Sequence, residues 1–187
     1  MPPRRVTNPP QAASLPHITR GARLDSPYPF AFRLSENGTM ANQIQPIPEG
    51  FHTLTPYLLV ADAEKEIEFA RAAFDARTIH ISRLPDGSVM HATLLIGTSL
   101  LMLGQVSGKM RPVPAMLYMY VEDADAVFGR AVTSGARVVR ELADQPWGDR
   151  SGGVISANGI QWWIATLIED VSEKELQRRM APRDSVG

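Results

Sequence analysis

The chain has 187 residues, of which 44% are hydrophobic and 21% are charged, and its formal net charge is −1 at pH 7. This composition is typical of one globular domain, and no apolar run is long enough to cross a membrane. The sequence contains no cysteine, which excludes disulfides, thiol catalysis and zinc–thiolate sites and is compatible with a cytoplasmic location.

Residues 1–45 differ in composition from the rest of the chain. They hold seven prolines and five arginines and lack a sustained apolar period, which predicts a disordered or extended extension. The prolines would interrupt the amphipathic helix of an organellar transit peptide. Met40-Ala41-Asn42-Gln43 looks like a natural start, so we expect Met40 to be the true initiator. After residue 39 acidic residues outnumber basic ones, so this part of the chain lacks the excess of basic residues that is typical of nucleic-acid-binding domains.

One pattern occurs twice in the remaining sequence. Val60-Ala61-Asp62 and Val121-Glu122-Asp123 each open a helix-like stretch, which continues through strand-like segments to a glycine, Gly97 or Gly159, and an apolar run. From the Asp to the Gly is 35 residues in the first copy and 36 in the second. A long pattern that occurs only twice indicates a duplicated module of secondary structure. The predicted domain covers residues 46–170, with modules at 53–106 and 115–166.

The first module is predicted as a strand, a helix and three further strands. Asp62 is a good N-cap for the helix, in which Ile67, Ala70 and Phe74 form one apolar stripe. Pro85-Asp86-Gly87 predicts a hairpin turn. The strands are expected over residues 53–60, 78–83, 89–96 and 100–103.

The second module repeats this order. A strand is expected over 116–121, and Ala124, Val127 and Ala131 form the apolar stripe of the following helix, with Gly135 at the position of a C′ glycine. Residues 171–187 are predicted as a C-terminal helix and tail. Within them, Glu175 and Arg179 have the spacing of a helical ion pair.

Four segments carry a resemblance to a known family: residues 50–58 (GFHTLTPYL), 90–97 (MHATLLIG), 147–152 (WGDRSG) and 168–172 (IEDVS). In order and spacing they resemble the vicinal oxygen chelate superfamily, of which the PhnB-like group of glyoxalase and bleomycin-resistance proteins looks nearest. The resemblance implies an α+β fold with two βαβββ modules in a half-barrel. It also implies a homodimer whose paired modules complete cavities for a small molecule. It is less specific for an activity, because one fold hosts many chemistries.

The resemblance also allows the metal site to be assessed. Metal-dependent members place one ligand on the first strand and one on the last strand of each module. The corresponding positions here are Thr55, Leu101, Met116 and Trp163. None of these residues is a usable ligand for a hard or borderline divalent cation, so we predict no metal site and no cofactor.

Strand alternation predicts which side chains line the cavity. Met116, Tyr118 and Tyr120 should face it, with the intervening residues in the core, and Trp163 should face it while Trp162 is core. The predicted lining is Thr53, Thr55, Tyr57, Leu101, Met116, Tyr118, Tyr120, Gln161 and Trp163. Such an aromatic, mildly polar pocket suits a planar or apolar small molecule. The alternative is that these side chains pack a closed core or a dimer interface.

Trp147 and Arg150 extend the predicted ligand site, because a polar loop brings a planar ring and a guanidinium close together. Arg150 is a candidate clamp for a carboxylate or phosphate of the ligand. The alternative is that Arg150 pairs with Asp149 or Glu141 and holds this loop over the pocket.

The histidines offer one candidate catalytic residue. His91 lies in a predicted strand beside the cavity and has the chemistry of a general base near neutral pH, although a strand histidine is often a hydrogen-bonded structural residue. His52 would approach His91 if their strands are neighbours, which gives at most two metal ligands. His80 is expected on an exposed face, and His17 falls in the N-terminal extension.

Two functional hypotheses follow. The first is a metal-free small-molecule-binding protein, related to drug-sequestering proteins such as the bleomycin-resistance group, that acts as a homodimer. The alternative is a metal-assisted lyase, isomerase or dioxygenase with a non-standard site around His91. A regulatory or interaction module has no positive support in the sequence. The choice between binding and turnover, and the identity of the ligand, stay open at this point.

Overall fold

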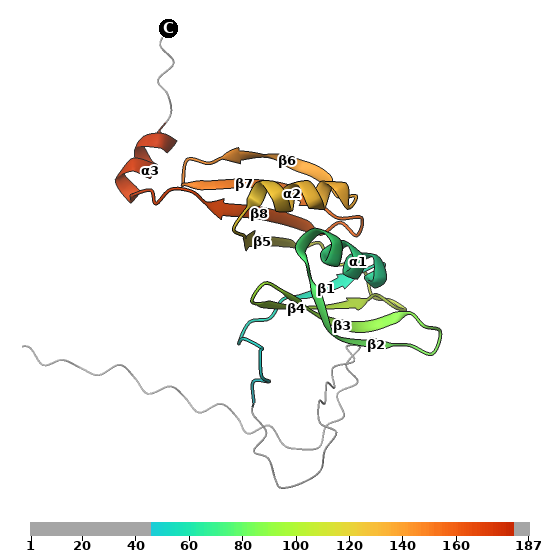
Figure 1. The fold of residues 1–187 in the computed structure, drawn as a ribbon. Helices are drawn as coiled ribbons and strands as arrows, with labels where there is room; N and C mark the ends of the chain where they lie inside the picture. Colours follow the sequence, from blue (N-terminus) through green and yellow to red (C-terminus); the bar gives the residue numbers. More distant parts are fainter. Residues whose placement is uncertain (1–45, 182–187) are drawn as a thin grey trace, which may run out of the picture. The chain divides into compact units, whose positions relative to one another are not determined.

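The structure is a computed structural model that describes residues 46–181 (Figure 1). The predictions made for residues 1–45, including disorder, the position of His17 and the role of Met40 as initiator, lie outside this range. Within it, no helix has both the length and the apolar character needed to cross a membrane.

The first module is a strand, a helix and three strands, as predicted. Its four-stranded sheet has the order β1-β4-β3-β2, in which β1 and β4 are parallel and the other neighbours are antiparallel. We refer to it as the first sheet. The elements are β1 (Tyr57–Val60), α1 (Ala63–Phe74), β2 (Arg77–Arg83), β3 (Val89–Ile96) and β4 (Ser99–Gln105).

The second module has the same topology. Its sheet, the second sheet, has the order β5-β8-β7-β6, again with a parallel pair, β5 and β8. The elements are β5 (Met116–Tyr120), α2 (Ala124–Thr133), β6 (Arg137–Asp144), β7 (Asp149–Ile155) and β8 (Gln161–Leu167), followed by the helix α3 (Glu173–Met180). The predicted α+β fold with two βαβββ modules is therefore confirmed.

Local sequence signals set the ends of both module helices. The side chains of Asp62 and Asp123 accept hydrogen bonds from backbone N–H groups at the start of α1 and α2, at 3.1 and 2.9 Å. Gly135, with φ of 96°, follows α2, where its N–H bonds the carbonyl of Val132 at 3.0 Å. These N-caps and the C′ glycine match the expected signals. In α3, the predicted pair of Arg179 and Glu175 is present at 2.8 Å.

Each module helix covers one face of its own sheet. The apolar stripe of α1 (Ile67, Ala70, Phe74) packs in one core cluster with strand residues such as Leu101 and Leu103. In the second module, Val127 and Ala131 of α2 belong to the same core cluster, with Trp162 and Ile164 of β8. Figure 1 shows α2 lying across the second sheet. The opposite side of each sheet is called its helix-free face below.

A buried carboxylate joins the two modules. Glu66 on α1 is 1% exposed and accepts hydrogen bonds from three residues of the second module: Ser156 Oγ at 2.8 Å, Asn158 Nδ2 at 3.0 Å and Trp162 Nε1 at 3.2 Å. Asn158 also accepts from the backbone N–H of Asp62 at 3.0 Å. The turn between β7 and β8 is therefore fixed against the start of α1.

The first strand is shorter than predicted. It begins at Tyr57 instead of residue 53, because Pro56 has no N–H to donate to the sheet. The hydroxyl of Thr55 donates to the carbonyl of His52 at 3.2 Å. Thr53 and Thr55 therefore precede the sheet, and their predicted place on the cavity wall is wrong.

Candidate ligand-binding site

The helix-free face of the second sheet carries a row of aromatic side chains. Tyr118 and Tyr120 on β5 are 44% and 65% exposed, and Met116 on the same strand is 63% exposed. Tyr118 pairs with Trp163 of β8, and Met116 pairs with Gln161. These residues therefore lie on the face that strand alternation predicts. An exposed apolar patch of this kind marks a binding surface for a ligand or a protein.

Asp149 organises the aromatic row. It begins β7, is 2% exposed, and its Oδ2 accepts hydrogen bonds from Tyr118 Oη at 2.8 Å, Tyr120 Oη at 3.2 Å and Trp147 Nε1 at 2.9 Å. Burial, followed by the hydrogen bond to Asp149, raises the pKa of both tyrosines above the usual value. The two phenols therefore stay protonated at neutral pH and act as donors to the carboxylate. The result is a set of three rings in fixed orientations.

Arg140 lies beside these rings. Its guanidinium carbon is 5.9 Å from the ring centre of Trp147 and 5.6 Å from that of Trp163, distances at which a cation is attracted to an indole. It also donates a hydrogen bond to Gln145 Oε1. A Cβ atom at Gly153 would lie 3.1 Å from Cε2 of Trp163, so a glycine at this point of β7 lets the Trp163 ring lie against the strand.

The orientation of Gln145 is itself fixed. This side chain is 7% exposed, and its Nε2 donates to the carbonyl oxygens of Ala143 at 2.8 Å and Ser151 at 3.3 Å. Because both amide hydrogens are directed to backbone oxygens, Oε1 is left to accept from Arg140. Gln145 is therefore a positioning residue for the guanidinium.

Arg140, Gln145 and the central role of Asp149 were not predicted from the sequence. Register shifts in β6 lie between Val138 and Arg140 and between Arg140 and Ala143, so strict alternation does not predict where Arg140 points. Asp149 was considered only as an ion-pair partner for Arg150. The available signal was the clustering of Trp147, Asp149 and two strand tyrosines, all of which carry hydrogen-bonding groups.

Arg150 does not belong to this face. It forms ion pairs with Asp125 of α2 at 2.6 Å and Asp144 at 2.9 Å, so its guanidinium lies on the helix-covered side. Adjacent residues of a strand point to opposite faces, which separates Arg150 from Asp149. The prediction that Arg150 clamps a ligand is therefore wrong, as is the predicted pairing with Asp149 or Glu141.

Leu101, predicted to face the same cavity as Trp163, points instead to the helix-covered side of its sheet. It is 4% exposed and belongs to the core, whereas its neighbour Met102 pairs with Tyr57. The prediction counted four residues from Gly97 and from Gly159 as if these were equivalent. Tyr57 pairs with Met102 in the first sheet, as Tyr118 pairs with Trp163 in the second, so the equivalent of Trp163 is Met102.

On the first sheet, Tyr57 and His91 form a second aromatic contact on the helix-free face. Their rings stack at 5.6 Å, with His91 Nδ1 3.4 Å from Tyr57 Oη and Nε2 3.3 Å from Thr93 Oγ1. Burial first, and the charge of His80 second, lower the pKa of His91 below its usual value. His91 is therefore neutral at neutral pH.

His80, not His52, is the histidine beside His91. The two rings are 6.2 Å apart, and His80 is half-buried, so the prediction of an exposed face for it is wrong. His52 is exposed and precedes β1. Within residues 46–181, no group of three or more His, Cys, Asp or Glu side chains is arranged to hold a metal.

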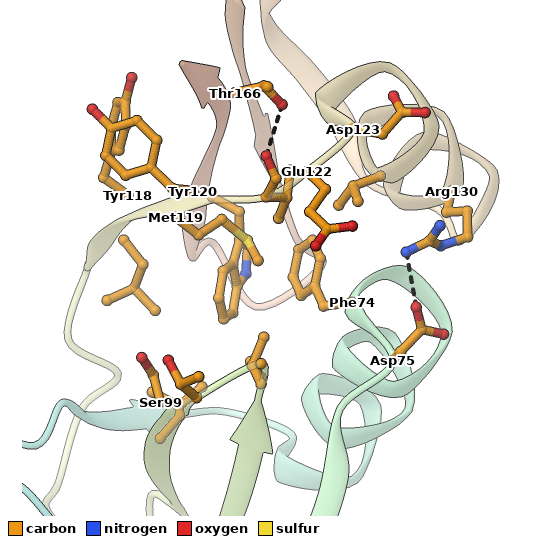
Figure 2. A pocket seen from close by; sticks show the side chains of 18 of the residues that line it. Phe74, Asp75, Ser99, Tyr118, Met119, Tyr120, Glu122, Asp123, Arg130 and Thr166 are labelled. Carbon is orange, nitrogen blue, oxygen red and sulfur yellow. Dashed lines mark hydrogen bonds and ion pairs between the residues drawn. The ribbon is translucent and has the colours of Figure 1, made fainter. Parts of the chain in front are cut away.

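A cleft of about 1240 Å³ lies between the modules. Figure 2 shows Tyr118 and Tyr120 on one side of β5 and Met119 on the other, next to Phe74. Arg130 and Asp75 also line this cleft and form an ion pair at 2.9 Å (Figure 2). Its lining includes Tyr118 and Tyr120 together with residues of the helix-covered side such as Leu101, so the cleft adjoins the aromatic row.

Two βαβββ modules that share one topology define a duplicated α+β domain, and its exposed aromatic face is a candidate binding surface. Residues 50–164 match the family model of the glyoxalase/bleomycin resistance protein/dioxygenase superfamily, and the chain belongs to this superfamily.

The chain is also similar to proteins of two mycobacteria. An uncharacterized protein of Mycobacterium tuberculosis is 36% identical over 159 residues, which is 78% of this chain and 89% of that protein. An uncharacterized protein of Mycobacterium bovis is 38% identical over 141 residues, 68% of this chain and 91% of that protein.

Two crystal structures share the fold. TioX from Micromonospora sp. ML1 aligns with a TM-score of 0.55 and 23% identity, covering 63% of this chain and 100% of that one. A glyoxalase-related enzyme from Clostridium phytofermentans aligns with a TM-score of 0.50 and 15% identity, covering 65% of this chain and 100% of that one.

Proposed function

We propose that this chain is a small-molecule-binding protein of the glyoxalase and bleomycin-resistance type that works without the metal site of its superfamily. The observation that carries this proposal is the aromatic row around Asp149, because three rings in fixed orientations form a surface suited to a planar molecule. The cytoplasmic location and the PhnB-like grouping are part of the same proposal. They are supported by the lack of cysteine and by the four sequence segments.

The donor set argues against a metal centre at the superfamily's positions. Met116 and Trp163 lie on the helix-free face, Thr55 precedes the sheet, and Met102 takes the place assigned to Leu101. Two thioethers, an indole and a single hydroxyl do not make a site for a hard or borderline divalent cation.

Metal analysis of the purified protein tests this proposal against the enzymatic alternative. We expect less than stoichiometric Ni, Zn, Mn or Fe, and no change in metal content in the His91→Ala variant, because the His91 ring lies against Tyr57, Thr93 and His80. A stoichiometric metal that is lost in His91→Ala would overturn the binding-protein proposal. It would favour a metal-assisted lyase, isomerase or dioxygenase.

We also propose that the protein is a homodimer. The strands β1 and β5 each pair with one neighbour only, so both modules present an open sheet edge, and the tyrosines of β5 are exposed beside it. Open edges and exposed aromatic rings are usually covered in a native assembly. A second copy, related by a two-fold axis, would cover them and complete the cavities.

Light scattering at micromolar concentration should therefore give twice the chain mass of 20.5 kDa. Because a dimer that depends on these edges dissociates by mass action, dilution should shift the measured mass toward the monomer. A monomer mass at all concentrations would contradict the proposal.

A further inference from the structure

The exposed charge on the aromatic face is positive. Asp149 is buried and its Oδ2 is surrounded by three donors, whereas Arg140 is exposed. Trp147 contacts both charged groups: its N–H donates a hydrogen bond to Asp149, and its ring makes a cation–π contact with Arg140. A ligand that approaches this face therefore meets a guanidinium, while the carboxylate is withdrawn into the sheet.

Arg140 is held in place without an acidic partner. None of the ion pairs between residues 46–181 includes it, in contrast to Arg150, which binds two aspartates. Its contacts are two indole rings and the oriented amide of Gln145. An arginine held by two indole rings and an amide oxygen has restricted motion, and its remaining N–H groups can bind a carboxylate through two parallel hydrogen bonds.

We infer that the ligand of this face is a planar acid, whose carboxylate is bound by Arg140 and whose ring lies against Trp163 and Trp147. This inference rests on the proposed ligand-binding function and names the chemical class of the ligand. The phenols of Tyr118 and Tyr120 provide the remaining wall. A cationic ligand is disfavoured, because the only acidic group among these contacts, Asp149, is buried and already accepts from three donors.

Three probes of one shape test the inference: 2-naphthoate, the neutral 2-naphthamide and the cationic 2-naphthylmethylamine, each titrated into the full-length protein by calorimetry. We expect 2-naphthoate to bind about tenfold or more tightly than 2-naphthamide, because a charge-assisted hydrogen bond pair adds at least that factor. Arg140→Gln should remove the difference between the two probes, and Arg140→Lys should retain part of it. The affinity for 2-naphthamide should change little.

Arg137→Gln is the matched control, because it removes the same charge from the same strand at an exposed position and should leave the preference for 2-naphthoate intact. Thermal unfolding of each variant shows whether it is folded. Equal affinities for the three probes, tightest binding of the amine, or an unchanged preference in Arg140→Gln would each overturn the planar-acid inference and leave the binding function standing. If 2-naphthamide and 2-naphthoate both fail to bind the native protein, the proposed binding function and this inference fall together.

Discussion

The Glu66→Ala variant is expected to lose about 3–5 kcal/mol of its free energy of unfolding, since each buried donor left without a partner costs about 1–3 kcal/mol. Glu66 is 1% exposed and receives hydrogen bonds from Ser156, Asn158 and Trp162. Removal of the carboxylate leaves these groups unpaired between the modules and opens a cavity. Urea denaturation followed by circular dichroism measures the loss.

Glu64→Ala is the control on the same helix. Glu64 is exposed and pairs with Arg83 at 2.7 Å, an arrangement that contributes at most about 1 kcal/mol. If the two variants lose the same free energy, the buried contact of Glu66 does not stabilise the packing of the modules as inferred.

Adjacent tryptophans on β8 should respond to substitution in opposite ways. Trp162 is 2% exposed, packs on Phe74 with a ring distance of 4.6 Å and donates to Glu66. Trp162→Ala should therefore cost about 3–5 kcal/mol of stability, as is typical for a core aromatic residue. Its effect on the affinity of the folded protein for a planar acid should be small.

Trp163→Ala should cost less stability and remove most of the ligand affinity. This ring is half-buried on the helix-free face, next to Arg140 and Gly153. Parallel measurements of unfolding and of 2-naphthoate binding distinguish the two residues. If Trp162 controls binding and Trp163 controls stability, the ligand lies on the helix-covered side, in the cleft between the modules.

Local patterns in the sequence were sufficient to predict the order of helices and strands in both modules. The N-caps Asp62 and Asp123 and the apolar stripes predicted both helices, and alternation along β5 and β8 placed Tyr118 and Trp163 on the same face. The errors have specific local causes. The first strand begins after Pro56, and the register between β1 and β4 places Met102, not Leu101, opposite Tyr57.

The polar contacts of the candidate site could not be predicted from such patterns. Asp149 receives donors from β5 and from the turn before β7, and Arg150 is bound by Asp125, which is 25 positions away in the sequence. Pairings across that separation depend on the packing of α2 and on the irregular register of β6. A single sequence contains the groups that take part, but periodicity alone does not say which of them meet.

The contact of Glu66 with the β7–β8 turn implies that neither repeat is self-sufficient. The carboxylate that completes the hydrogen bonding of Ser156, Asn158 and Trp162 is supplied by the other repeat. If the chain were divided in the connection between β4 and β5, each half would expose one side of this contact. Two such fragments should therefore recognise each other when mixed, and the duplicated halves have become complementary parts that are no longer interchangeable copies.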